Sequence, residues 1–405
     1  MALTFRSALF QAHWLVGITA GVVLGIVGLT GAILSFESEI QRALNGDVRR
    51  IEPGVAVPLS LTQLVSEVGR QLPDKRITAL GLSGDPADSV RVTFAAEGAA
   101  SGGRGRGETR YVNPYTGAMM AGDGARGQEF FRTTRSLHRW LTADLFGNQQ
   151  LGRHIVGAST LLGVLLVISG IYLRWPRRPG SLSMWLTFNP ALKGRTFLWH
   201  LHAIVGTWAM LALLLMSLTG LYWSYDWYRN GLYAISGVER PAPRGEGPRG
   251  REGAQRGDAQ EAASPAVDLD AVWAAFNRET ATTSFSTATL TWPRAAGQPL
   301  EIRYAEADPQ HNRAMNTLTL GATDGTVVRH ERYATKRAGE KFMSSIFAIH
   351  SGSFFGLAGV IIYMLASLTM PLFTITGWMM YLGRRQRKKR AALAGRSDSA
   401  ATSTI

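Results

Sequence analysis

Four long apolar stretches dominate the pattern of hydrophobic and polar positions along the chain. They cover residues 14–36, 155–175, 203–225 and 354–382, and only the second contains a charged residue, Arg174 at its end. A helix needs about 20 apolar residues to cross the hydrocarbon core of a bilayer, and each stretch is that long. One such stretch also fits a buried helix of a soluble protein, but four in one chain predict an α-helical membrane protein with four transmembrane helices.

Lys and Arg gather at one end of the four spans. Arg6 precedes the first span, and the others lie around the 176–195 link and in the 384–405 tail: Arg174, Arg177, Arg178, Lys193, Arg195, Arg384, Arg385, Arg387, Lys388, Lys389 and Arg390. Short cytoplasmic segments are enriched in Lys and Arg. The pattern therefore predicts that both termini and the link are cytoplasmic, and that the long loops 38–137 and 229–345 lie outside.

Each outer loop carries a helix pattern followed by strand patterns. Residues 59–72 have the spacing of an amphipathic helix, and 89–94, 286–292 and 300–304 read as strands. Each loop also holds a turn with a glycine, Gly117 or Gly325, at the position that requires a positive φ. We therefore expect two small periplasmic α+β modules. The Gly- and Arg-rich segments 97–110 and 239–265 lack apolar periodicity and predict flexible excursions.

Composition changes this picture in two ways. The 405 residues carry a formal net charge of +14 with only 18% charged residues. Such a charge often indicates nucleic-acid binding, but here the surplus lies in the cytoplasmic flanks of the spans and indicates topology. The chain has no cysteine, which excludes disulfides, thiolate metal sites and cysteine nucleophiles.

The chain is a tandem duplication of one unit: span, outer module, span. Six positions in and around the first span recur around the third at identical offsets. Arg6, His13, Gly17, Thr30, Gly31 and Glu37 correspond to Arg195, His202, Gly206, Thr219, Gly220 and Asp226. The second and fourth spans also correspond, because His138 precedes Ser169-Gly170 as His350 precedes Thr376-Gly377. The spanning segments of the two units are 1–37 with 138–175, and 196–228 with 346–383.

Each unit supplies one histidine near the cytoplasmic side and one near the outer side. His13 and His202 form the inner set, and His138 and His350 the outer set. A neutral imidazole is a good axial ligand of heme iron, so two sets at two depths predict two b-type hemes.

Other interpretations of the histidines stay open. A histidine at a helix end is often structural, and His154, at the outer start of the second span, is an alternative to His138 as the outer ligand. His200 cannot share a helix face with His202. His311 and His330 fall in the second outer module, where we expect them to be solvated.

These residues resemble the PepSY-associated transmembrane family. The carrying motifs are His13-Trp-Leu-Val-Gly17, Leu137-His138-Arg-Trp-Leu141, Ser169-Gly-Ile-Tyr-Leu-Arg-Trp-Pro-Arg-Arg178, Leu201-His202-Ala-Ile-Val-Gly206 and Thr376-Gly377. The resemblance implies a bacterial inner-membrane protein similar to the di-heme ferric-siderophore reductases. The chain departs from the family at position 203, which is Ala where the family often has Arg next to the histidine. With that Arg absent, we expect Arg6 and Arg195 to hold the propionates of the inner heme that the resemblance implies.

Two functions follow as expectations. The first is an oxidoreductase that takes electrons from a cytoplasmic donor or a quinol and reduces a periplasmic ferric-siderophore in iron uptake. No GxGxxG motif follows a strand, so the electron source is expected to be external. The second is a non-enzymatic membrane protein whose outer modules bind or regulate a periplasmic peptidase or another protein. Membrane lipid is the common partner, and no nucleic acid is expected.

Overall fold

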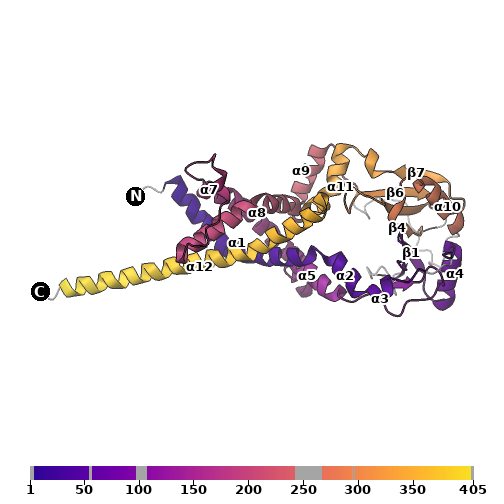
Figure 1. Cartoon of the computed structure of the whole chain (residues 1–405), viewed down its shortest axis with the longest axis horizontal. Coiled ribbons are helices and arrows are strands. Elements are labelled where there is room, and N and C mark those ends of the chain that lie inside the picture. Colours follow the sequence, from indigo (N-terminus) through magenta and orange to yellow (C-terminus); the bar gives the residue numbers. More distant parts are fainter. Residues whose placement is uncertain are drawn as a thin grey trace, which may run out of the picture. The chain divides into compact units, whose positions relative to one another are not determined.

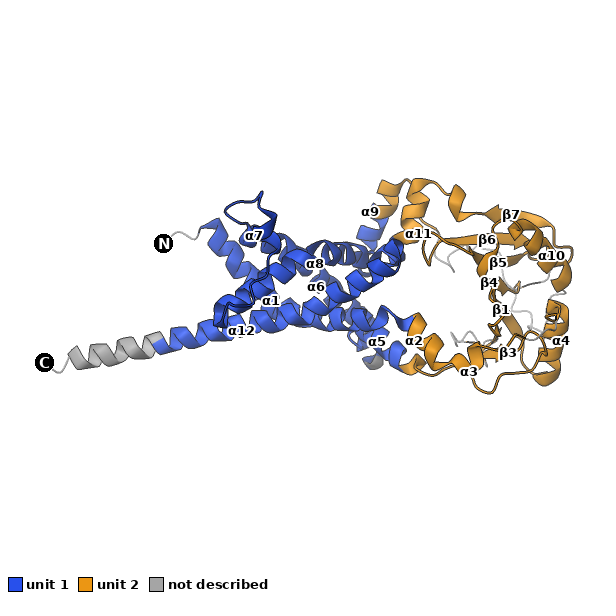
Figure 2. Ribbon diagram, in the orientation of Figure 1, with its two compact units in different colours: residues 1–37, 130–231, 346–405 blue, residues 38–129, 232–345 orange. Residues whose placement is uncertain are grey.

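The computed structural model describes residues 4–53, 57–96, 107–241, 267–293, 295 and 297–402. The chain divides into two compact units (Figure 2): unit 1 holds residues 1–37, 130–231 and 346–405, and unit 2 holds 38–129 and 232–345. Each sequence repeat therefore contributes to both units. Most of the two predicted flexible excursions, residues 97–106 and 242–265, falls outside the described residues.

Unit 1 is built on four long apolar helices, α1 (Phe5–Leu34), α6 (Gln149–Arg174), α8 (Gly194–Ser224) and α12 (Gly356–Thr402) (Figure 1). All four are long and apolar enough to cross a membrane, which confirms the multi-pass prediction. Helix α1 packs against α6 and α12, and α8 packs against the same two helices. Helix α12 is longer than the predicted span, because its backbone remains helical through the basic tail as far as Thr402.

Glycines allow α1 and α12 to approach closely. A methyl group on Gly25 would lie 3.0 Å from the Thr374 hydroxyl oxygen and 3.6 Å from the Cα of Pro371. The Thr374 hydroxyl also donates to the carbonyl oxygen of Gly21 at 2.6 Å. Small residues let membrane helices pack through their backbones, so this contact brings the first span of one repeat against the second span of the other.

Short helices at the ends of the spans complete unit 1. Helix α5 (Gln128–Trp140) precedes η2 (Ala143–Phe146) and α6, and α11 (Ala338–Ser351) precedes η4 (Ser353–Phe355) and α12. Gly352 ends α11 with φ 79°, the left-handed conformation that glycine adopts most readily. Helices α7 (Leu182–Leu186) and α9 (Asp226–Ser236) flank α8.

Unit 2 contains one antiparallel sheet of seven strands, in the order β3-β2-β1-β4-β5-β6-β7. The first repeat supplies β1 (Ile77–Ser83), β2 (Val90–Phe94) and β3 (Thr109–Val112). The second supplies β4 (Phe285–Thr291), β5 (Leu300–Glu306), β6 (Met315–Leu320) and β7 (Val327–Glu331). Strands β1 and β4 pair directly, with Leu80 opposite Leu290. The two predicted modules are therefore halves of one sheet.

One hydrophobic core serves both halves of this sheet. Helices α4 (Leu61–Gln71) and α10 (Leu269–Thr280) contact each other and cover the sheet with side chains such as Leu64, Val68 and Phe276, all buried. The strands alternate buried and exposed positions, as expected for a sheet with one covered face. Gly117 and Gly325 have φ values of 71° and 65°, which confirms the predicted turns. Helices α2 (Glu37–Leu44) and α3 (Gly46–Arg49) complete the described N-terminal part.

The two histidines of unit 2 are not solvated, contrary to expectation. His311 is 5% exposed, and its Nε2 lies 2.9 Å from both the Tyr333 hydroxyl and the Ser345 hydroxyl. His330 lies between the Tyr304 hydroxyl, at 2.8 Å, and a carboxylate oxygen of Glu279, at 2.9 Å. Buried polar groups are stable when hydrogen-bonded. His330 therefore links β7 to β5 and to α10, and His311 links the loop between β5 and β6 to Tyr333 and to Ser345.

Candidate functional site

The four histidines predicted as ligands form two close pairs in unit 1. The ring centres of His13, on α1, and His202, on α8, are 6.5 Å apart, with 73° between the ring planes. The ring centres of His138, on α5, and His350, on α11, are 6.4 Å apart, with 64° between the planes. The structure thus brings together the residues that the duplication paired, and each pair joins one histidine from each repeat.

A hydroxyl group contacts the Nδ1 atom of every one of these histidines. His13 Nδ1 lies 2.8 Å from Ser169 Oγ, and His202 Nδ1 lies 2.9 Å from Thr376 Oγ1. His138 Nδ1 lies 3.2 Å from Thr30 Oγ1 in the same arrangement. His350 Nδ1 lies 3.0 Å from Thr219 Oγ1. Each hydroxyl residue directly precedes one of the glycines that recur in the duplication.

These hydroxyls fix which imidazole nitrogen carries the proton. Each one donates its hydrogen to a carbonyl four residues earlier in its own helix, for example Ser169 to Leu165 at 2.6 Å and Thr219 to Leu215 at 2.6 Å. Thr30 and Thr376 make the equivalent bonds at 2.7 and 2.8 Å. The hydroxyl oxygen is left to accept, so the histidine Nδ1–H donates. In a neutral imidazole the other nitrogen, Nε2, then carries a free lone pair.

The duplication explains which hydroxyl contacts which histidine. Every hydroxyl lies in the same repeat as the histidine it accepts from: Ser169 with His13 and Thr30 with His138 in the first, Thr376 with His202 and Thr219 with His350 in the second. Each repeat therefore orients its own two imidazoles. The contact between repeats then sets each histidine opposite its partner.

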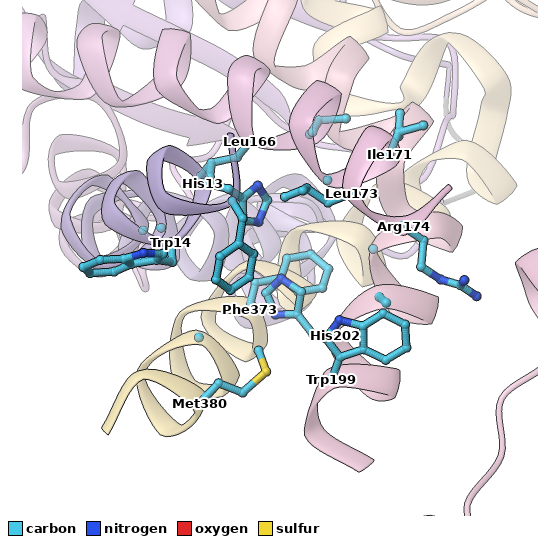
Figure 3. A pocket seen from close by; sticks show the side chains of 18 of the residues that line it. His13, Trp14, Leu166, Ile171, Leu173, Arg174, Trp199, His202, Phe373 and Met380 are labelled. Carbon is cyan, nitrogen blue, oxygen red and sulfur yellow. The ribbon is translucent and has the colours of Figure 1, made fainter. Parts of the chain in front are cut away.

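A cavity of about 650 Å³ adjoins the inner pair. Figure 3 shows His13, Phe373 and His202 close together in its lining, and the ring of Phe373 lies 5.0 Å from that of His202. Pockets that hold cofactors commonly measure about 300–1,000 Å³. The volume suits a ligand of the size of a tetrapyrrole.

Four arginines line the same cavity: Arg6, Arg174, Arg195 and Arg384. They come from the first residues of α1 and α8 and from the C-terminal ends of the apolar stretches in α6 and α12. Two polar atoms of the lining, Trp14 Nε1 and Arg174 Nε, are buried with no hydrogen-bond partner among the described residues. Buried donors without partners are costly.

The donor set fits heme better than a bare metal ion. Within the described ranges, no group of three or more His, Asp or Glu side chains could hold a metal ion. Two histidines suffice for an iron that already has four porphyrin nitrogens. Imidazole nitrogen binds a metal at about 2.0 Å. With ring centres 6.5 and 6.4 Å apart, each pair leaves room for one iron atom that would bind a nitrogen of both histidines.

The remaining histidines of unit 1 lie outside the two pairs. His154 is exposed on α6, where its Nε2 lies 3.1 Å from Gln150 Nε2. The structure therefore pairs His138, not His154, with His350. His200 Nε2 accepts the backbone N–H of Asn189 at 3.0 Å, and its ring stacks on Phe188. This contact organises the 176–195 link.

Sequence reasoning missed two parts of the site. The roles of Ser169, Thr30, Thr219 and Thr376 were not predicted, although the matched glycines beside them marked the positions. Arg174 and Arg384 were noted for topology and not for the cavity, where they join the predicted Arg6 and Arg195. Their position depends on where the ends of four helices meet.

The fold and this site define a multi-pass membrane protein with two histidine pairs set between duplicated halves. Its sequence matches the family described as the PepSY-associated TM region over residues 10–384. The chain belongs to that family. Comparison with curated proteins gives no significant match.

Proposed function

We propose that this chain is a di-heme transmembrane oxidoreductase that reduces a periplasmic ferric-siderophore during iron uptake. The observation that carries the proposal is the pair of adjacent imidazoles at each site, with Nδ1 in contact with a hydroxyl and ring centres 6.5 and 6.4 Å apart. A structural histidine also needs a hydrogen-bond partner, but it does not need a second imidazole beside it. Four histidines with the same tautomer and pairwise spacing match what two b-type hemes require of a protein.

The distribution of charge supports the direction of electron flow. The arginines of the cavity belong to the same basic set that the positive-inside rule assigns to the cytoplasm. We therefore place the His13–His202 pair towards the cytoplasmic side of a bacterial inner membrane. The segments of unit 2 are connected to the ends of the spans that lack these basic residues, and we therefore place unit 2 in the periplasm. Electrons come from a cytoplasmic donor or from a quinol.

The role of the protein chain is to bind the hemes and to orient their histidine ligands. Heme iron, when bound, supplies the one-electron chemistry. The hydroxyls of Ser169, Thr376, Thr30 and Thr219 hold the proton on each Nδ1, so that every Nε2 is presented as a ligand. The four arginines of the cavity would neutralise carboxylates of an inner heme.

The substrate is an Fe(III) chelate with hard oxygen ligands. Addition of one electron converts its Fe(III) to Fe(II), which binds such ligands more weakly. The product is therefore easily released from the chelator. Each ferric ion consumes one electron, so a two-electron quinol would serve two chelates.

Visible spectroscopy of the purified full chain, expressed with ample heme, tests the proposal. We expect a sharp reduced α-band and two hemes per chain. After reduction by dithionite and removal of the excess, a ferric hydroxamate should reoxidise the protein, and a chromogenic Fe(II) chelator should capture one Fe(II) per heme. A colourless, folded protein would overturn the proposal and favour the protein-binding alternative.

Two alanine variants provide a matched comparison. His138→Ala removes a member of the outer pair and should leave one heme per chain. His154→Ala removes the exposed histidine nearby on α6 and should retain two. Loss of a heme from His154→Ala, with two retained in His138→Ala, would show that the outer ligand is His154.

A further inference from the structure

The two histidine pairs differ in the acceptors available to Nδ1–H. Among the described residues, each inner histidine has one acceptor, the hydroxyl of Ser169 or Thr376. Each outer histidine has a backbone carbonyl as well. His138 Nδ1 lies 2.9 Å from Val27 O, and His350 Nδ1 lies 3.0 Å from Met216 O. The same difference occurs in both repeats, so it is a property of the site and not of one side chain.

The distance between each imidazole and the glycine beside it does not by itself separate the two pairs. A methyl group built on Gly31 would lie 3.2 Å from His138 Cε1, and one built on Gly220 would lie 3.4 Å from His350 Cε1. At the inner pair the equivalent distance from Gly170 to His13 is 3.5 Å, and Gly377 has no neighbour within 4 Å. What distinguishes the outer pair is the carbonyl three residues before the threonine, which lies within hydrogen-bond distance of Nδ1 in both repeats.

We propose that these two carbonyls make the heme of the outer pair the one with the lower midpoint potential. The inference rests on the proposed function. A carbonyl that accepts from Nδ1–H increases the electron density on the imidazole and raises its basicity as a ligand. A more electron-rich ligand stabilises Fe(III) relative to Fe(II), and this lowers the potential. The acceptors Val27 O and Met216 O are thus positioning groups that tune the site.

The tuning has a direct use in the proposed reaction. A lower potential makes the outer site the stronger reductant, and this site is the one we place nearest the Fe(III) chelate. Because the extra acceptors are backbone atoms, side-chain substitution cannot remove them. Gly31 and Gly220 lie directly beside the outer imidazoles, so a methyl group at either position would press on the ring.

Spectroelectrochemical measurement on the purified di-heme protein tests the proposal. We expect two separate midpoints. In His138→Ala, which should lack the outer heme, the component that disappears should be the lower one. Equal midpoints, or loss of the higher component, would overturn this inference and leave the di-heme function standing. A colourless protein would instead overturn the proposed function itself.

A matched pair of variants uses the duplication as its own control. Thr376→Val removes the acceptor of His202 Nδ1, so the inner midpoint should rise or the inner heme should be lost. Thr219→Val removes the equivalent hydroxyl from His350, which still has Met216 O, so its heme should stay bound with a smaller shift. An equal or larger effect of Thr219→Val on its own heme would contradict the proposal.

Discussion

The substitution Gly31→Ala tests whether the outer site depends on close contact between imidazole and helix. The new methyl group would lie 3.2 Å from His138 Cε1 and 3.6 Å from its Nδ1, in a helix whose backbone cannot easily move. The imidazole must therefore withdraw by a few tenths of an ångström. Both of its hydrogen bonds, to Val27 O and to Thr30 Oγ1, then lengthen.

The expected cost follows from the tightness of this contact. Extra methyl groups in packed interiors typically cost about 1–3 kcal/mol. If this cost falls on the heme-binding geometry, the affinity of the outer site drops by roughly 5- to 150-fold. The inner site, held by His13 and His202, should not change.

The assay is the heme-to-protein ratio, followed by the rate at which each heme is lost to an excess of apomyoglobin. Gly383→Ala is the control, because Gly383 also lies in a membrane-helix segment but has no neighbour within 4 Å. Both variants gain the same intrinsic helix propensity. Faster heme loss from Gly31→Ala alone is expected, and equal behaviour of the two variants would refute the reasoning.

Two further predictions concern spectroscopy and pH. Within each pair the two imidazole planes are inclined to each other, by 73° in the inner pair and 64° in the outer pair. The oxidised di-heme protein should therefore give strongly anisotropic low-spin ferric EPR signals. The rhombic signal that is typical of parallel imidazoles would contradict this geometry. Burial lowers the pKa of His311, so the unfolded chain binds its proton more readily and stability should fall as the pH decreases below about 6.5. Thermal unfolding of the full chain should therefore depend less on pH in His311→Gln, and an unchanged dependence would exclude His311 as the cause.

The sequence predicted the spans well because the bilayer imposes a length and a composition that can be counted. Residues 14–36 and 203–225 fall almost entirely within α1 and α8. The ends of the helices were not predicted, because polar residues such as Arg6 and Arg195 continue a helix beyond the hydrocarbon core. The histidine pairs were predicted from the offsets of the duplication, although their role as heme ligands stays a prediction.

The sheet shows what repeat patterns alone do not decide. Each outer loop reads as a separate module, because its helix and strands follow one another in the sequence. The pairing of β1 with β4 joins residues about 210 positions apart, such as Leu80 and Leu290. The sequence of neither strand specifies its pairing partner, because an edge strand can pair with any strand of compatible register.

By itself, the sequence determined the number of spans, the basic end of the bundle, the duplication and the four histidines in register. These properties depend on composition and spacing, which act locally along the chain. The tertiary structure decided that the imidazoles lie beside each other in pairs, that a hydroxyl contacts each Nδ1, and that, among the described residues, the outer pair reaches backbone carbonyls while the inner pair does not. Those properties depend on differences of a few tenths of an ångström between helices, and such distances are set by the packing of glycines against side chains from distant parts of the chain.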